Sequence, residues 1–335
     1  MVKGFTEDGN ILCADGTVLG LPEPEPTIGQ DCPNHLVPGA DFTNCDFVAA
    51  GISDFSNLDL SNANFSGATI ANGSFEGANL TGTNFSGARV SGSFEGANLN
   101  GWTVQGASFS NLNHAGGNFA GTHWSGAEFI ACNWSNADLT AADFSGTFLS
   151  DCTFEGAGMR MVKMNQVVFD QVSLNDAGVN QAELTGAMFV HSTFLNTDFS
   201  ESQLVSAYFV TPLFSEGDNP VSFRGASLVG VVINSPGGPG LMNIDWTGAD
   251  MTQIKIRDAQ LYGSDFTDAV LLNGLFCNTF PLGSVNGTVF SNTTCPNGVN
   301  SDDNGGDCVG ARLINEANLC NNFPGVPTGL APLAP

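Results

Sequence analysis

The chain has 335 residues, with 8 Lys and Arg against 33 Asp and Glu, so its formal net charge is −25. That charge repels nucleic acid and anionic membrane surfaces, which excludes both as expected partners. The 42 glycines and 26 phenylalanines, with only 12% charged residues, indicate strands and turns, because glycine disfavours helix while phenylalanine needs a regular interior. No stretch approaches the apolar length of a membrane-spanning helix, so membrane insertion is not expected.

Residues 1–39 come before the repeat described below and predict an N-terminal cap. They begin MVKGFTEDGN, which lacks the apolar stretch of a secretory signal. Caps are needed at both ends of a repeat array, because an open end would present unpaired strand edges.

From residue 40 to residue 278 a large apolar residue recurs every five positions. One register runs from Leu60 to Val90, one residue is then dropped, and a second register runs from Phe94 to Phe214. A period of five fits neither an α-helix nor a plain strand, so the backbone has to turn a corner once in each unit. Shorter registers cover residues 42–52, 223–233 and 246–276.

The position two residues before each large residue is small, as at Ala63, Ala68 and Ala78. Each unit therefore points one large and one small residue inward and three residues toward water. This A-[DN]-[LF]-x-x pattern resembles the pentapeptide-repeat family. The resemblance implies an all-β fold, a right-handed four-sided parallel β-helix (β-solenoid) with four units per coil and irregular N- and C-terminal caps.

About 46 units would make about 11 coils, a tower roughly 50 to 55 Å tall at a strand spacing of about 4.8 Å. Side chains one coil apart then stack, which places Phe129, Leu149 and Phe169 in one apolar ladder. Gly, Pro and Asn interrupt the pattern and predict loops near residues 215–222 and 234–245.

The chain beyond residue 278 no longer follows the repeat. We expect a Cys-containing C-terminal cap at residues 279–323. A Pro-rich tail at residues 324–335 closes the sequence, within the stretch FPGVPTGLAPLAP.

The nine cysteines divide by position. Cys45, Cys132 and Cys152 fall at small inward positions and are expected to be buried, inert core residues, with a Cys132–Cys152 disulfide as the minority alternative. The other six lie in or beside the caps, which predicts disulfide staples and an oxidising compartment. The most local pairings are Cys13 with Cys32 and Cys295 with Cys308.

Residues 300–305 read NSDDNG and fit the N-x-D-x-N-G start of a calcium loop. The turn loosely resembles the Asp-rich calcium repeats of thrombospondin-like proteins. The twelfth position, where an EF-hand supplies a bidentate Glu, is Ala311. A solvated turn without metal is the alternative, and no other cofactor is expected. The candidate oxygen ligands are Asn300, Asp302, Asn304 and Asp307.

Catalytic chemistry finds little support in the sequence. The four histidines are scattered, and no nucleophile or metalloprotease motif occurs. His114 takes an interior centre position, which we interpret as a local bulge or as a buried histidine with hydrogen-bond partners. An enzyme is therefore not expected.

One side of the predicted square differs from the other three in its outward residues. The other sides present mainly Asn, Asp, Ser, Thr, Glu and Gln, whereas this side is apolar on successive coils and carries few charges, Glu128 and Asp170. A contiguous apolar strip of this kind predicts a protein interface. The alternative is that a cap or the loop after Ile233 covers it. The predicted partner-binding residues are Ile130, Phe148, Val168, Met188, Val190, Tyr208 and Val210.

These features predict a non-enzymatic rigid scaffold or a protein-interaction and adhesion module. Its partner would be another protein or a second copy of the chain, held through the apolar side. We expect an extracellular or cell-surface location; a cytoplasmic one is the alternative, because the sequence as written carries no signal peptide. The alternative function is an acidic DNA mimic that binds a topoisomerase such as gyrase, which the resemblance to quinolone-resistance members of the family implies.

Overall fold

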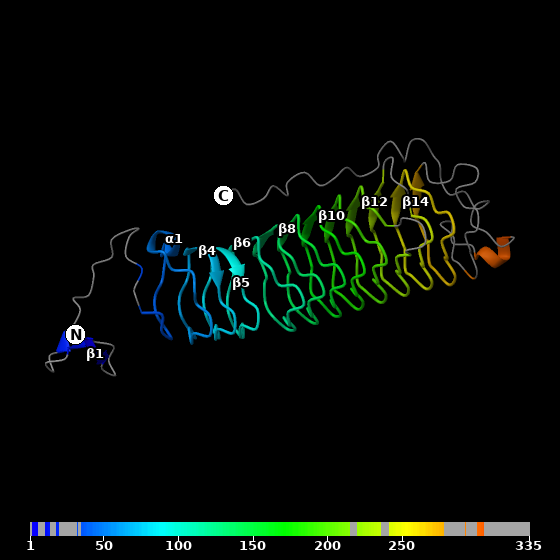
Figure 1. Cartoon of the computed structure of the whole chain (residues 1–335). Coiled ribbons are helices and arrows are strands. Elements are labelled where there is room, and N and C mark those ends of the chain that lie inside the picture. The colour runs from blue at the N-terminus through cyan, green and yellow to red at the C-terminus, as the bar shows by residue number, and fades with distance from the viewer. Residues whose placement is uncertain are drawn as a thin grey trace.

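The computed structural model describes residues 2–5, 11–13, 18–19, 32, 35–214, 220–235, 241–277, 292 and 300–304. The chain winds into a right-handed four-sided β-solenoid whose strands form one parallel sheet of 11 strands (Figure 1). This confirms the predicted fold class. The strands of this sheet are β4 (Thr69–Ser74), β5 (Arg89–Ser93), β6 (Ser108–Ser110), β7 (Glu128–Ile130), β8 (Phe148–Ser150), β9 (Val168–Asp170), β10 (Met188–Val190), β11 (Tyr208–Val210), β12 (Val232–Asn234), β13 (Lys255–Arg257) and β14 (Leu275–Cys277).

Few other elements accompany the sheet in the described part of the chain. Near the N-terminus, β1 (Val2–Phe5), β2 (Ile11–Cys13) and β3 (Val18–Leu19) form a separate antiparallel sheet. A single helical turn, α1 (Phe47–Ala50), precedes β4, and a short 3-10 turn, η1, spans Ser301–Asn304. Among the described residues, no helix is long and apolar enough to span a membrane.

Each strand of the large sheet belongs to a different coil, so neighbouring strands are joined by whole turns of the solenoid. Backbone bridges between coils recur on the other sides as well, usually at the step of four five-residue units that the pattern predicts. Parallel strands normally need long crossovers, and here three further sides of the coil serve as the crossover. One coil shows all four sides through these pairs: Asn113 with Asn133, Asn118 with Asp138, His123 with Asp143, and Glu128 with Phe148.

A tight turn forms most corners of the square. At one of them the N–H of Ala63 donates to the carbonyl of Leu60 at 3.0 Å, and Asn62 between them has φ +59°. This left-handed conformation favours Gly and Asn, and Gly67 takes it at the next corner with φ +67°. The Gly and Asn residues that recur in the pattern are thus the corner residues.

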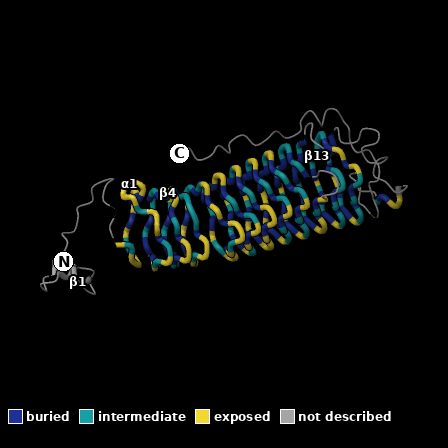
Figure 2. Tube along the Cα trace, in the orientation of Figure 1, coloured by how far each residue is buried: buried dark blue, intermediate teal, exposed yellow. Residues whose placement is uncertain are grey.

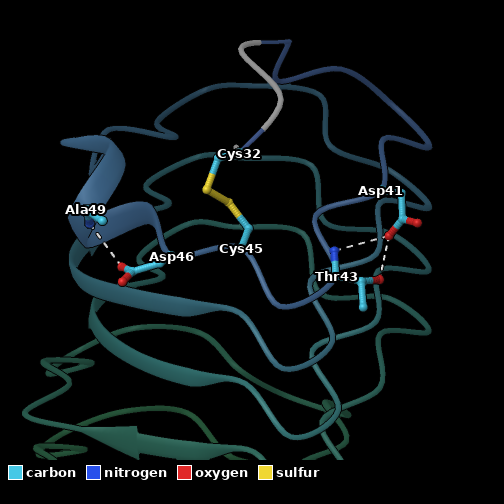
Figure 3. The surroundings of a disulfide bond; sticks show 6 residues. All are labelled: Cys32, Asp41, Thr43, Cys45, Asp46 and Ala49. Carbon is cyan, nitrogen blue, oxygen red and sulfur yellow. Dashed lines mark hydrogen bonds between the residues drawn. A yellow bond between two sulfur atoms is a disulfide. The ribbon is translucent and has the colours of Figure 1, made fainter. Parts of the chain in front are cut away.

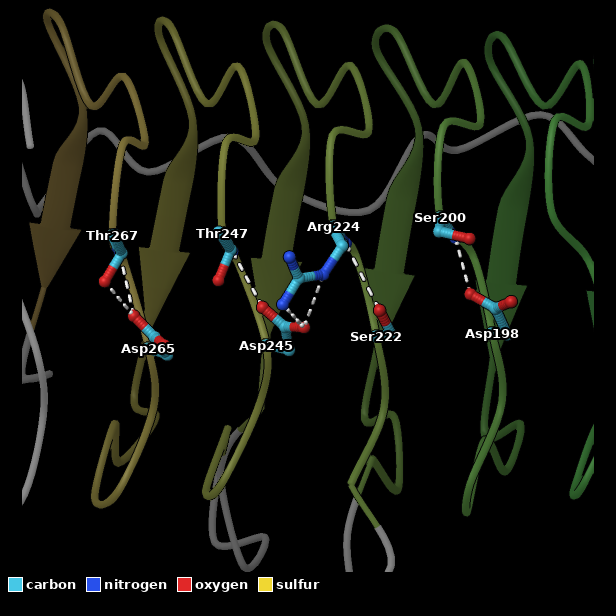
Figure 4. Close-up of polar contacts among 8 residues, drawn as sticks. All are labelled: Asp198, Ser200, Ser222, Arg224, Asp245, Thr247, Asp265 and Thr267. Carbon is cyan, nitrogen blue, oxygen red and sulfur yellow. Dashed lines mark hydrogen bonds and ion pairs between the residues drawn. The ribbon is translucent and has the colours of Figure 1, made fainter.

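The outward Asp and Asn residues cap the backbone at these corners. The Asp265 carboxylate accepts hydrogen bonds from the backbone N–H of Thr267 at 2.9 Å and from its hydroxyl at 2.6 Å. Asp245 binds the Thr247 N–H in the same way on the preceding coil (Figure 4). An Asx or Ser/Thr side chain that binds the N–H two residues on stabilises a turn. The D/N–x–S/T part of each unit therefore has a local structural role.

The interior is filled by one large and one small residue from each unit, as predicted. Phe129, Leu149 and Phe169 are fully buried and occupy matching positions on paired strands. Aromatic rings on successive coils stack closely, with centroids 4.5 Å apart for Phe55 and Phe75. Buried and exposed positions alternate around every coil (Figure 2). The ladder of large side chains is one continuous core.

The coils are not all the same length, and the differences lie where the repeat pattern breaks. Asp41 bridges Asn64, whereas a coil of regular length would bring it to Ser61, because α1 inserts into the first coil. The coil that contains Gly92 is shorter than the regular one by a single position, so Asn79 bridges Asn98. Gly92 has φ +135°, and a Cβ atom there would collide with the backbone carbonyl of a neighbouring glycine.

Two coils are longer than the regular one. Asp198 bridges Ser222, and Ser222 in turn bridges Asp245, so both of these coils hold more chain than a regular one. The insertions fall on residues 215–219 and 236–240, which lie outside the described residues. Pairing returns to the regular step between Asp245 and Asp265, so an insertion changes the length of a coil without disturbing the coils after it.

A disulfide at the start of the solenoid corrects one prediction. Cys45 is not a free core residue and Cys32 does not pair with Cys13: Cys32 and Cys45 bond to each other, with Cα atoms 5.2 Å apart (Figure 3). Cys45 occupies a small inward position, but it lies on the first coil, so no preceding coil fills the space next to it. The segment before the solenoid is thereby attached to its open end.

Candidate partner-binding face

The outer face of the large sheet carries two rows of outward side chains, one before and one after the buried centre residue of each strand. In-register pairing aligns these rows along the tower. We call this surface the outer face of β7 to β14. The first row is Glu128, Phe148, Val168, Met188, Tyr208, Val232, Lys255 and Leu275; the second is Ile130, Ser150, Asp170, Val190, Val210, Asn234, Arg257 and Cys277.

All seven residues of the predicted strip lie on this face and in register. Their exposure, however, is lower than an open strip would have. Ile130, at the N-terminal end of the strip, is 38% exposed, whereas Val168 is 8% and Met188 is 7% exposed. The middle of the strip is therefore largely removed from water, although its register points away from the interior.

The apolar face extends further than the sequence pattern indicated. Val232, only 4% exposed, follows Tyr208 in the first row, and Leu275 and Cys277 continue the two rows on β14. Together they form a second apolar cluster separate from the interior. These residues were missed because the insertions in two coils shift the numbering. Counting from the centre residue of each strand, rather than in steps of one regular coil, would have found them.

Charge is unevenly distributed on the outer face. Glu128 and Asp170 lie toward its N-terminal end, on β7 and β9, while Lys255 and Arg257 lie on β13. The chain has only eight Lys and Arg residues, so two basic residues on one strand stand out. The face has acidic groups at one end and basic groups at the other, with uncharged rows between them.

The turn proposed to bind calcium is only partly described. Just before η1, the Asn300 side-chain oxygen accepts a hydrogen bond from the Asp302 N–H at 2.9 Å, and Asp302 Oδ1 accepts one from the Asn292 N–H at 3.0 Å. Two of the candidate ligands therefore already cap backbone donors. Asn304 closes η1, and Asp307 lies outside the described residues. Calcium binding by Asn300, Asp302, Asn304 and Asp307 stays a prediction.

Cys132 and Cys152 are free and buried, in agreement with the expected core role. The Cys152 thiol lies 3.3 Å from the carbonyl of Ser150, to which it donates, and its sulfur accepts the N–H of Cys132 at 3.4 Å. Contact with the Cys132 thiol and burial both raise the pKa of Cys152. The thiol is thus kept neutral and hydrogen-bonded, which is a structural role.

His114 is buried at a centre position, but without the expected hydrogen-bond partners. Its ring lies 4.2 Å from that of Trp134 and 4.6 Å from that of Phe119. Neither ring nitrogen has a hydrogen-bond partner among the described residues. Burial lowers the pKa of His114 to about 3, so the imidazole is neutral. It substitutes for an aromatic core residue and is closed off from any substrate.

The other polar surfaces form structural contacts between coils. On the side drawn in Figure 4, the Arg224 guanidinium contacts the Asp245 carboxylate at 3.2 Å. Among the described residues, no three His, Cys, Asp or Glu side chains are grouped so that they could hold a metal ion. The outer face of β7 to β14 is therefore the surface that differs most from a plain structural repeat.

Comparison with known proteins supports the repeat assignment. The family model described as pentapeptide repeats matches eight copies, at residues 59–94, 118–156 and 132–171. No curated protein matches the chain.

Solved structures of pentapeptide repeat proteins resemble the chain at low identity. HetL, involved in heterocyst differentiation regulation in the cyanobacterium Nostoc, is 14% identical over 78% of this chain and 92% of its own, with a TM-score of 0.28. QnrB1, a plasmid-mediated fluoroquinolone resistance protein, is 14% identical over 60% of this chain and 90% of its own, with a TM-score of 0.31.

A pentapeptide repeat protein of the Arabidopsis thaliana thylakoid lumen is 24% identical over 31% of this chain and 72% of its own, with a TM-score of 0.30. The eight matched repeats, the corner turns and the four-sided coil agree on one assignment. The chain therefore contains the repeats of the pentapeptide-repeat family, matched at residues 59–94 and 118–171.

Proposed function

We propose that the protein is a non-enzymatic, rigid interaction module that binds a protein partner through the outer face of β7 to β14. The observation that carries the proposal is the run of aligned apolar side chains on the outer side of a sheet whose inner side already forms the core. Every strand is paired within the solenoid, so the face presents a firm surface that need not order itself on binding. This favours a scaffold or adhesion role.

The simplest partner is a second copy of the chain. Two flat faces can stack about a two-fold axis that lies between them. If the axis runs along the strands and passes β10, β7 of one copy lies opposite β13 of the other, which sets Glu128 against Lys255. With the axis along the tower, β7 of one copy would instead lie opposite β7 of the other, which brings the two Glu128 carboxylates to the same level and sets no basic residue against them. Charge therefore favours the antiparallel dimer.

Location enters the proposal through the disulfides. Cys32 and Cys45 form one, and Cys277 is also disulfide-bonded. Structural disulfides persist in oxidising compartments, which favours a secreted or surface-exposed protein over a cytoplasmic one.

Light scattering across a concentration series tests the docking face. We expect dimers that strengthen with salt, because salt screens the repulsion between two chains of charge −25. The double substitution Val168→Lys, Met188→Lys should abolish them, while Lys163→Glu on another side should not. A wild type that stays monomeric, or dimers that ignore the double substitution, would exclude this homodimer.

Charge exchange tests the antiparallel arrangement separately. Lys255→Glu should weaken the dimer several-fold, and adding Glu128→Lys to it should restore the affinity. If the second substitution weakens the dimer further, Glu128 and Lys255 do not face each other.

The acidic DNA mimic is the second candidate, favoured by the net charge of −25 and the rod shape. Such a protein would bind a topoisomerase such as gyrase in place of duplex DNA. Gyrase supercoiling measured with increasing protein decides between the two: inhibition at stoichiometric amounts would support the mimic, and unchanged supercoiling would exclude it.

A further inference from the structure

Side chains in the middle of the outer face are covered, although their register points them to water. Val168 is 8% exposed, Met188 is 7% and Val232 is 4%, against 38% for Ile130 at the edge of the same surface. Neighbouring side chains on a sheet flank one another along the ladder but do not lie over one another. Flanking side chains on the neighbouring strands account for part of this low exposure, and a segment that lies over the first row from β9 to β12 would account for the rest.

Neither the inserted residues after Ser235 nor the N-terminal segment is well suited to lie over the first row from β9 to β12. Five residues join Ser235 to Leu241, enough to project roughly 10 Å and return, whereas Val168 lies three coils, about 14 Å, from Val232. Residues 1–31 carry six carboxylates, and within them β1, β2 and β3 pair with one another in a separate sheet. An acidic segment would gain little binding free energy on an apolar face, because its carboxylates would lose water without finding a partner.

The C-terminal segment has both a suitable attachment and a suitable composition. Cys277 ends the second row, is fully buried and is disulfide-bonded. Its partner is neither Cys132 nor Cys152, which are free, nor Cys32 or Cys45, which bond to each other. The remaining cysteines are Cys13, Cys295, Cys308 and Cys320, and three of these four belong to the C-terminal segment.

Residues 317–335 contain no charged side chain, which is unusual in a chain of net charge −25. They also contain four prolines. Proline favours extended backbone and lacks an N–H donor, so a segment of this composition suits a sheet face whose backbone groups are all used within the sheet. The 15 residues after Cys320 extend about 46 Å at about 3.1 Å each, while β14 to β9 spans about 24 Å. Its apolar side chains are Leu319, Phe323, Val326, Leu330 and Leu333.

We propose that residues 317–335 dock in cis on the outer face of β7 to β14 and compete there with a protein partner. The docking in cis stands by itself, whereas the competition rests on the proposed function, because it requires a partner that binds the same face. Binding in trans then requires release of the segment, which raises the apparent dissociation constant of the dimer.

Methionine oxidation by dilute hydrogen peroxide tests the docking directly, at a protein concentration where light scattering gives the monomer mass. Met188 on the face should oxidise roughly fivefold to tenfold more slowly than Met161, which is 48% exposed and serves as the internal reference. Peptide mass spectrometry reads both sites in the same sample.

Two variants of the full chain and one shortened chain complete the test. Val326→Asp, Leu330→Asp should bring the Met188 rate several-fold closer to that of Met161, and so should a chain ending at Asn322. Asn321→Asp, Asn322→Asp adds the same charge at polar positions and should leave the ratio unchanged. If Met188 stays protected in both the apolar-site variant and the shortened chain, the segment does not cover it and the inference is wrong.

The two proposals can fail separately. If Met188 is protected in the wild type and loses its protection in the tail variants, while no dimer forms at any concentration, the cis docking is retained and the homodimer is rejected. Dimers that respond to Val168→Lys, Met188→Lys while Met188 oxidation ignores the tail variants would retain the docking face and reject the competitor. A lower dimer dissociation constant in Val326→Asp, Leu330→Asp supports both.

Discussion

The sulfur of Cys152 accepts the backbone N–H of Cys132 at 3.4 Å, one coil away. At the equivalent place two coils later, the Ser192 hydroxyl accepts the N–H of Val172 at 3.3 Å. At this corner the N–H is thus satisfied by a side chain from the next coil. Small polar residues at this inward position, such as Cys152 and Ser192, therefore complete the backbone hydrogen bonding of the neighbouring coil.

Cys152→Ala should lower the free energy of unfolding by about 1 to 3 kcal/mol, because it leaves the buried N–H of Cys132 without an acceptor. Cys152→Ser should cost clearly less, since Ser192 already fills this role in the same column. Denaturant melts of the two variants measure the difference. Equal losses for Ala and Ser would mean that the hydrogen bond contributes nothing.

His114 should make the free energy of unfolding depend on pH below 6.5, down to the pH at which the carboxylates begin to take up protons. Burial lowers its pKa from 6.5 to about 3, so in this window the unfolded chain binds a proton that the folded chain does not. Stability is therefore highest above pH 6.5 and falls as the pH drops, by up to about 1.4 kcal/mol per pH unit.

His114→Leu supplies the control for this prediction, because it keeps an apolar side chain between Phe119 and Trp134 and removes the titrating group. Melts at pH 7 and pH 5 should differ less in the variant than in the wild type. The same pH slope in both proteins would show that another group causes it.

Phe169→Ala in the middle of the ladder should cost about 3 to 5 kcal/mol. The ring is fully buried and stacks 4.5 Å from that of Phe189, and the paired backbone on either side cannot collapse into the space. Lys163→Ala, at an exposed outward position, should change stability by less than about 0.5 kcal/mol. Comparable losses in urea melts would contradict the inward and outward assignment.

Thiol titration under denaturing, non-reducing conditions should find no more than five free thiols. The chain has nine cysteines, of which Cys32 with Cys45 and Cys277 with its partner account for four. Cys132 and Cys152 belong to the free set. A count above five in protein purified without reductant would mean that at least one of the two disulfides is absent.

Much of the architecture could be predicted because each unit repeats the same physical choices. The five-residue period requires a backbone that turns a corner in each unit, and it predicts that Phe129 and Phe169 lie in one ladder. The residue missing from the pattern before Phe94 corresponds to the shortened coil at Gly92. The predicted face is likewise in register. These features depend on local sequence, which recurs in every coil.

The remaining features depend on which segments meet, and the repeat holds no information about that. The Cys32–Cys45 bond arises because the first coil leaves its inward position open, whereas sequence distance favoured Cys13 with Cys32. The repeat register predicts that the Met188 side chain points outward, but it does not predict that this side chain is only 7% exposed. His114 was expected to have hydrogen-bond partners, yet its neighbours are aromatic rings.

The coils differ in the number of residues they contain, but this difference does not change the height of the solenoid. The lengthened coils add the same rise as the regular ones, because the rise is set by pairing between strands such as β11 and β12. The outer face therefore has a fixed pitch of about 4.8 Å per row, whatever the corners carry. A partner that binds this face therefore meets rows at a constant spacing, even where a coil carries inserted residues.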